Sequence, residues 1–159
     1  MFRLVDRVKQ GLAYALALSL GAGLSPVWPG TAGAAVGLLC ALLLGALPPV
    51  GQVAGLVVML AVGIWASAVV ARTRQEDDPQ SVVIDESFGA AATVLALPAE
   101  PLWWALGFLA FRFFDIAKPF PVDWVQDHVK GGTGIMLDDA AAALYAIAIL
   151  WPASRFFAG

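Results

Sequence analysis

The sequence predicts an all-α fold, that of a small helical protein that crosses a membrane several times. The chain is 60% hydrophobic and 13% charged over 159 residues, whereas soluble domains average roughly 45–50% apolar and about 25% charged residues. The apolar residues form continuous runs that end at prolines, and most charged residues lie between these runs. Residues 1–159 are therefore expected to form a single membrane-embedded domain.

The first apolar run spans residues 4–20. Arg3 precedes it, and Arg7 and Lys9 lie near its start. Basic residues ahead of LAYALALSL would also fit a secretory signal. The turn-rich stretch GAGLSPVWPG and further apolar segments come next, which favours a helix lying on or partly in the membrane. We therefore expect an N-terminal amphipathic or membrane-associated helix.

Prolines bound the later helical segments, because a proline cannot continue the helical hydrogen-bond ladder. The segments are residues 31–47, 52–71, 81–97 and 102–118, and a last one that Asp138 or Asp139 opens and that runs to about residue 151. About four transmembrane helices are expected, given the roughly 20 residues that a bilayer core requires. The segments beside Pro98 and Pro101 are short, so an in-plane or re-entrant hairpin is an alternative there.

The charged residues are distributed asymmetrically across the predicted membrane. With a cytoplasmic N-terminus, eight of the nine basic residues fall on the cytoplasmic side and only Arg155 falls opposite, as the positive-inside rule requires. Eleven of the twelve acidic residues share that side, all but Glu100. The positive-inside rule does not explain the acidic residues, so their enrichment predicts an active site facing the cytoplasm.

The residue counts exclude several classes of site. Cys40 is the single cysteine, which excludes an internal disulfide, and His128 is the single histidine, which excludes a zinc site of the usual kind. His128 is expected to have a solvated or a packing role, and Asp123 and Asp127 are expected on a solvated face. With nine basic residues and a net charge of −3, no nucleic-acid partner is expected. Carboxylates remain as metal ligands, which favours magnesium, manganese or calcium.

Four clusters of residues converge on the predicted cytoplasmic face, and the first is GLSPVWPGTAG, residues 23–33. Its glycines and prolines form a tight turn that leads into a helix near Thr31. Backbone N–H groups at the start of a helix favour an anion, which makes Thr31 a candidate substrate-binding residue. The alternative is a plain interfacial turn anchored by Trp28.

The second cluster is IDESFG, residues 84–89, with Asp85 and Glu86 in the first turns of an apolar helix. Acids at a helix start complement the helix dipole, which accounts for one acid on a solvated face. Two adjacent acids at the edge of an apolar run favour a role in metal binding and catalysis. Gly89 lies one turn after Asp85, so we expect no bulky group to cover that face.

The third cluster is RFFDIAKPFP, residues 112–121. Arg112 and Asp115 are three residues apart and share a helix face, which Lys118 continues. A structural ion pair is the alternative, but arginine suits bidentate phosphate binding. Arg112 and Lys118 are therefore candidates for substrate binding. Asp115 is a candidate catalytic residue, either as a metal ligand or as the group that holds Arg112.

The fourth cluster is GGTGIMLDD, residues 131–139. Gly131 and Gly132 leave the backbone free to approach a ligand, which makes them candidates for substrate binding. Asp138 and Asp139 are candidates for catalysis and metal binding. Adjacent residues on a helix point about 100° apart, so either one acid faces inward or one binds metal directly and the other through water. Helix capping is the alternative for one of the pair.

No nucleophilic side chain stands out, because a GxSxG elbow and a reactive-cysteine setting are both absent from the sequence. The chemistry that remains is attack by water on a phosphorus polarised by a carboxylate-held metal. Arginine and lysine would neutralise the developing charge.

The elements GLSPVWPGT, DESFG, RFFDIAKPFP and GGTGIMLDD, in this order, resemble the phosphatidylglycerophosphatase A family over residues 21–146. The resemblance implies a magnesium-dependent phosphatase, multi-pass in the bacterial inner membrane. It implies that the terminal phosphate of phosphatidylglycerophosphate is removed to give phosphatidylglycerol. It also implies a functional polar set: Asp85, Glu86, Arg112, Asp115, Asp138 and Asp139.

Three other functions are compatible with parts of this pattern. An ion-coupled transporter would also place acids and an arginine in a membrane, although such sites favour the bilayer midplane and internal repeats, and no repeat is visible here. A structural subunit of a membrane assembly would use the acids only for pairing between chains. A phosphatase for another lipid phosphate would share all of these features. The oligomeric state is not indicated by the sequence.

Overall fold

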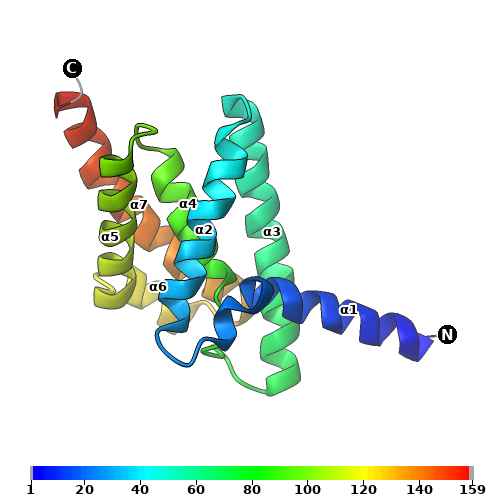
Figure 1. The fold of residues 1–159 in the computed structure, drawn as a ribbon. Helices are drawn as coiled ribbons and strands as arrows, with labels where there is room; N and C mark the ends of the chain where they lie inside the picture. The colour runs from blue at the N-terminus through cyan, green and yellow to red at the C-terminus, as the bar shows by residue number, and fades with distance from the viewer. Residues whose placement is uncertain (1, 158–159) are drawn as a thin grey trace.

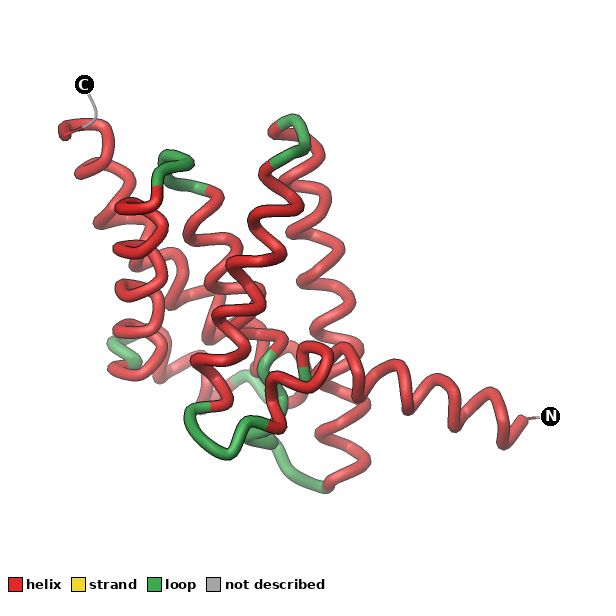
Figure 2. Tube along the Cα trace, in the orientation of Figure 1, coloured by secondary structure: helices red, strands yellow, loops and turns green. Residues whose placement is uncertain are grey.

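The computed structural model describes residues 2–157, which within those bounds form helices and turns without a β-strand. Figure 1 shows most helices side by side as a bundle, with the first helix projecting away from it, and Figure 2 shows how short the connecting loops are. The all-α prediction is confirmed. The elements are α1 Phe2–Ala17, the 3-10 helix η1 Ser19–Leu24, α2 Pro29–Gly45, α3 Pro49–Arg74, α4 Ile84–Leu95, α5 Pro101–Ala117, α6 Val122–His128 and α7 Gly131–Phe157.

Helix α1 points away from the bundle and reaches it only at its C-terminal end (Figure 1). Ala13 and Ala17 are buried there, whereas Arg7, Lys9 and the other side chains of residues 6–12 are exposed. The Arg74 guanidinium of α3 lies 5.8 Å from the centre of the Tyr14 ring and fixes this end of α1. The predicted amphipathic first helix is therefore present, but it ends at Ala17, where η1 redirects the chain.

Two helices in the described part of the chain are long and apolar enough to cross a membrane, α3 with 26 residues and α7 with 27. Helix α2 is a shorter apolar helix of 17 residues. Helix α4 has 12 residues and is therefore about 18 Å long, less than the roughly 30 Å of a hydrocarbon core. Four transmembrane helices remain a prediction, and the hairpin of α4 and α5 matches the re-entrant alternative better than two full spans.

Helices α2 and α4 pack unusually closely, because one face of α2 carries glycines. A Cβ atom added at Gly33 would meet Val83, and one added at Gly37 would meet the carbonyl oxygen of Ser87. The Ser87 hydroxyl donates a hydrogen bond to the Gly33 carbonyl oxygen at 2.7 Å across the same contact. Small residues let membrane helices approach until their backbones touch, and this contact fixes the first turn of α4 against α2.

The last helix differs from its prediction at both ends. It begins at Gly131, not at Asp138 or Asp139, and it continues past Pro152 to Phe157. Packing requires glycine at position 132, because a side chain there would collide with the backbone of Ile64 and Ala68 in α3. Pro152 lies in the last two turns, where its missing N–H removes only one hydrogen bond. The acids consequently sit inside α7, about two turns from its start.

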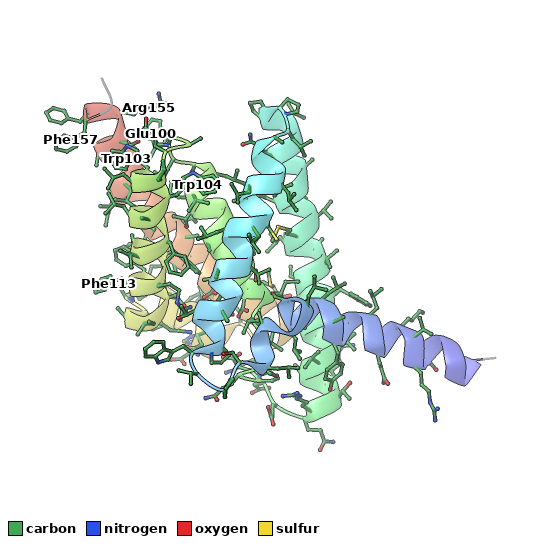
Figure 3. The ribbon with its side chains drawn as sticks, viewed as in Figure 1. Glu100, Trp103, Trp104, Phe113, Arg155 and Phe157 are labelled. Atoms are coloured by element: carbon green, nitrogen blue, oxygen red, sulfur yellow. The ribbon has the colours of Figure 1, made fainter. Side chains whose placement is uncertain are left out.

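The two ends of the bundle differ in chemistry. Aromatic side chains gather at the end far from α1, together with the charged residues Glu100 and Arg155, as Figure 3 shows for these two and for Trp103, Trp104 and Phe157. Tryptophan at such a position suits a membrane interface. The other end contains the starts of α2, α4 and α7 and the end of α5, and it contains every acidic residue predicted to be functional.

The α2–α4 contact gives a test of the fold. Gly37→Ala should lower the stability of the protein by about 1–3 kcal/mol, the usual cost of overpacking, because the added methyl group meets the Ser87 backbone. Gly11→Ala is the matched control, since a Cβ there meets nothing within 4 Å. Thermal unfolding in detergent measures both, and equal melting temperatures would contradict the close packing.

Candidate active site

A cavity of about 530 Å³ opens where α2, α4, α5 and α7 meet, at the end of the bundle nearer α1. We call it the carboxylate cavity. The loop between α3 and α4 closes one side of it. The residues that line it are Trp28, Pro29, Gly30, Thr31, Asp78, Gln80, Val82, Asp85, Glu86, Arg112, Asp115, Ile116, Lys118, Asp138 and Asp139.

Three acids meet inside the carboxylate cavity. Asp85 and Glu86 come from the first turn of α4, Asp139 comes from α7, and one carboxylate oxygen of each lies within 4.8 Å of the others. Asp139 is 2% exposed and Asp85 is 8% exposed. Burial raises the pKa of Asp85 well above its usual range, and the nearby charges of Glu86 and Asp139 raise it further.

The same three acids have spare ligand atoms. Within residues 2–157, Oδ1 of Asp85, Oε2 of Glu86 and Oδ2 of Asp139 are buried without a hydrogen-bond partner. Buried carboxylate oxygens without partners are costly, and a hard divalent cation takes oxygen ligands of this kind. The donor set therefore fits a magnesium-like cation.

Arg112 lies between the acids of α4 and α5. Its Nη1 atom forms a salt bridge with Oδ2 of Asp115, one turn further along α5, and lies 4.0 Å from Oε1 of Glu86. Nε of Arg112 is buried and has no partner within the described residues. Two carboxylates thus hold the guanidinium, which keeps donors free for an anion in the cavity.

Lys118 supplies the second cation of the cavity, but it does not continue the helix face of Arg112 and Asp115 as predicted. It ends α5 in a left-handed conformation, φ 43°, so it leaves the helix face that Arg112 and Asp115 share. Its Nζ donates a hydrogen bond to Oδ2 of Asp138 in α7 at 2.8 Å. Burial disfavours the charged amine, but the hydrogen bond and charge of Asp138 outweigh this and raise the pKa of Lys118.

The adjacent acids Asp138 and Asp139 therefore have separate partners. Asp139 joins Asp85 and Glu86, whereas Asp138 pairs with Lys118. The sequence left open which of the two faces a metal, because their spacing alone does not orient the helix. The geometry favours Asp139 as a direct ligand and Asp138 as the residue that positions Lys118.

The start of α2 forms the wall opposite Arg112. A Cβ atom added at Gly30 would meet the carboxylate of Glu86 and the guanidinium of Arg112, so only glycine allows this approach. Thr31 follows it and lines the cavity as predicted. Trp28 caps α2 in a left-handed conformation, φ 51°, which is rare for a residue with a side chain. Its ring is 77% exposed at the cavity mouth.

Three glycines differ from their predicted roles. Gly131 and Gly132 do not line the carboxylate cavity, and Gly132 instead allows α7 to pack closely on α3. Gly89 was expected to leave the acidic face uncovered. A Cβ atom there would collide with the Phe111 ring of α5, so Gly89 is a packing position and that expectation is wrong.

Sequence reasoning missed other residues of the cavity. Asp78 and Gln80 line it from the loop before α4, and no local motif marks them, because loop acids usually indicate a solvated surface. Gly30 could have been identified from the stretch PGT, which the sequence places at the start of a helix. Asp123, Asp127 and His128 are exposed on α6, as predicted.

Comparisons with known proteins show which proteins this chain is similar to. A family model described as Phosphatidylglycerophosphatase A matches residues 15–154. The phosphatidylglycerophosphatase A of Escherichia coli (strain K12) is 39% identical over 139 residues, 86% of this chain and 80% of that protein. The protein of the same description from Haemophilus influenzae is 33% identical over 86% of this chain and 85% of that protein. A Bacteroides thetaiotaomicron protein described as a "putative phosphatidylinositol-3-phosphatase" is 37% identical over 82% of this chain and 86% of that protein. No solved structure gave a significant match.

The contact at Gly30 gives a test of the cavity. Gly30→Ala should lower phosphatase turnover by about 100-fold, the effect of a displacement of about 1 Å at a reacting centre, because the methyl group displaces Glu86 and Arg112. Gly45→Ala, at the other end of α2, is the matched control, since a Cβ there lies 3.9 Å from Leu95. Phosphate release by the two purified variants measures the effect. Equal turnover would contradict the tight fit.

Proposed function

The chain belongs to the phosphatidylglycerophosphatase A family, and from this premise we propose that it removes the terminal phosphate of phosphatidylglycerophosphate with the help of magnesium. The products are phosphatidylglycerol and inorganic phosphate. That the chain is a lipid phosphatase follows from its family. The observation that supports the finer proposal is the meeting of Asp85, Glu86 and Asp139 with Arg112 in one cavity.

Asp85, Glu86 and Asp139 are the residues that would hold magnesium. A bound magnesium ion supplies Lewis-acid polarisation of the phosphoryl group and lowers the pKa of a water ligand. The unpartnered oxygens Oδ1 of Asp85, Oε2 of Glu86 and Oδ2 of Asp139 support this assignment.

The remaining polar residues of the cavity would bind and orient the phosphate. Arg112 lines the cavity with its guanidinium fixed by Asp115, which suits it to a phosphoryl oxygen. Lys118, held by Asp138, remains protonated and adds positive charge on the same side. Donors fixed before the reaction stabilise charge that develops on the phosphoryl group without a cost of rearrangement.

The cavity also suits a substrate anchored in a bilayer. Beside its acids it is lined by the exposed apolar side chains of Trp28 and Ile116, which are 77% and 72% exposed. We place the protein in the bacterial inner membrane with this cavity facing the cytoplasm. The basic residues at the same end of the bundle, among them Arg72 and Arg74 at the end of α3, support that orientation.

A phosphatase for another lipid phosphate is the second candidate, since one relative is described as a "putative phosphatidylinositol-3-phosphatase". Both candidates place a phosphomonoester among the same residues, so the headgroup distinguishes them. Ion transport has less support, because the charges gather at one end of the bundle and not at its middle.

Phosphate release from a panel of lipid phosphates tests the proposal. We expect the purified protein to hydrolyse phosphatidylglycerophosphate faster than phosphatidylinositol 3-phosphate or phosphatidic acid, and to stop when a chelator removes magnesium. Asp85→Asn and Asp139→Asn should each lower turnover by at least about 100-fold, the scale of losing one electrostatic contact in the transition state. Asp123→Asn, on the exposed face of α6, is the control. Full activity in excess chelator would refute the role of magnesium.

Arg112 gives a separate test of phosphate binding. Arg112→Lys keeps the charge but loses the planar pair of donors, so turnover should fall by at least about tenfold, and Arg112→Ala should lose more. If Arg112 only paired with Asp115, the lysine variant would stay active, and the alanine variant would lose thermal stability together with activity. Turnover and melting temperature of both variants therefore separate the two roles.

A further inference from the structure

A second cavity, of about 420 Å³, lies between α2 and α3. The two helices touch near their connecting turn, where Leu44 lies against Gly55, and they diverge away from it (Figure 1). We call the space between them the α2–α3 groove. Its lining residues are Leu16, Ser19, Leu20, Val36, Cys40, Val58, Met59, Val62, Ile84 and Ser87.

The groove offers nothing to a polar ligand. Apart from Cys40, the side chains that line it are apolar or belong to two serines, and both serine hydroxyls are already engaged. Ser19 Oγ and Ser87 Oγ lie 2.7 Å apart, and Ser87 also donates to the Gly33 carbonyl oxygen. A ligand here gains by burying hydrocarbon. The volume falls within the range of about 300–1,000 Å³ that is usual for ligand cavities.

The groove is separate from the carboxylate cavity. No residue within the described chain lines both spaces, because the contact of Gly33 and Gly37 with α4 lies between them. The floor of the groove is nevertheless formed by Ile84 and Ser87, which flank Asp85 and Glu86 in the first turn of α4. An occupant would therefore press on the back of the turn that supplies two of the three clustered acids.

The groove is continuous with the surface that faces the lipid. At its rim, Leu20 and Val58 are 83% and 60% exposed, and beside it on α2 Leu39 and Leu43 are exposed as well. Helix α3 is long and apolar enough to cross the membrane, so the groove opens toward hydrocarbon. In that surrounding the molecules available to fill an apolar groove are lipid chains.

We propose that the α2–α3 groove binds one acyl chain of a bilayer phospholipid that is not the substrate. The acyl chain enters the groove beside η1, where Ser19 and Leu20 mark the end nearer α1. It runs along Val36, Cys40 and Val62 toward the middle of the helices. Bound there, it supports the first turn of α4 from behind. This site does not depend on which lipid phosphate the enzyme hydrolyses.

Photo-crosslinking in nanodiscs tests the site. The probe is a trace of phosphatidylcholine with a diazirine in the middle of one acyl chain, in a phosphatidylglycerol bilayer. Crosslinks mapped by mass spectrometry should favour Val36, Cys40 and Val62 over the exposed residues Leu43 and Val53 of the same helices by about tenfold, a preference of about 1.4 kcal/mol. Equal labelling of both sets, as expected for freely exchanging lipid, would overturn the proposal.

A pair of variants supplies the control. Cys40→Phe fills the groove and should remove most of the groove crosslinks, whereas Leu43→Phe, one turn away and 76% exposed, should leave them unchanged. Val36→Phe, on the same wall, is a second variant in case Cys40→Phe does not fold, and melting temperatures check the fold of each. Undiminished groove crosslinks in a folded filling variant would also overturn the proposal. Neither readout requires phosphatase activity, so a failure of the proposed reaction would leave this test intact.

Discussion

The close contact between α2 and α4 is the constraint on which the rest of the structure depends. Glycines at positions 30, 33 and 37 give α2 one face without side chains. The backbone at the start of α4 rests against Gly33 and Gly37, and the side chain of Glu86 rests against Gly30. The Ser19 and Ser87 hydroxyls tie the same contact to η1. Because α4 has only 12 residues, its own packing area is small. Its position, and with it the position of Asp85 and Glu86, is set by the helix that it touches.

The site follows from this constraint by electrostatics. Bringing Asp85, Glu86 and Asp139 together in a buried place raises the energy of all three ionised groups. The chain places two cations beside them, Arg112 paired with Asp115 and Lys118 paired with Asp138. Each cation has an acid of its own, and Arg112 also lies 4.0 Å from Glu86, so the cations offset the central negative charge only in part. That arrangement leaves the three central acids available for a metal and the arginine available for an anion.

Much of the architecture could be predicted from the sequence. Continuous apolar runs bounded by prolines located α2 to α5 to within a few residues, since the bilayer forces backbone groups to be satisfied within each segment, whereas α7 is longer than predicted at both ends. The last helix was predicted to begin at Asp138 or Asp139, after the glycine run at 131–134, and glycine disfavours helices in isolation. In the fold, the close approach of α3 reverses that preference at Gly132. Long-range packing of this kind has no local signal in one sequence.

The candidate site was predictable in composition but not in pairing. Acids at the ends of apolar helices stand out because they are costly in a membrane, and this identified Asp85, Glu86, Asp115, Asp138 and Asp139. Which acid meets which cation depends on the rotation of α5 against α7. Lys118 was placed on the face of Arg112, and its left-handed backbone instead turns it toward Asp138. A single sequence does not contain that rotation, whereas the structure gives it directly.

The position of the site at the ends of the helices has a physical reason. Inside a bilayer the backbone is restricted to helices, and irregular segments occur only where protein or water covers them. A cavity that needs loop residues such as Asp78 and Gln80, as well as helix starts, must therefore lie near the interface. A lipid phosphate has its polar head at that depth and its chains in the apolar layer. The protein shows the same division. The polar residues of the carboxylate cavity, with the exposed Trp28 and Ile116 beside them, lie at the interface. The apolar groove behind α4 offers hydrocarbon contacts deeper along the same helices.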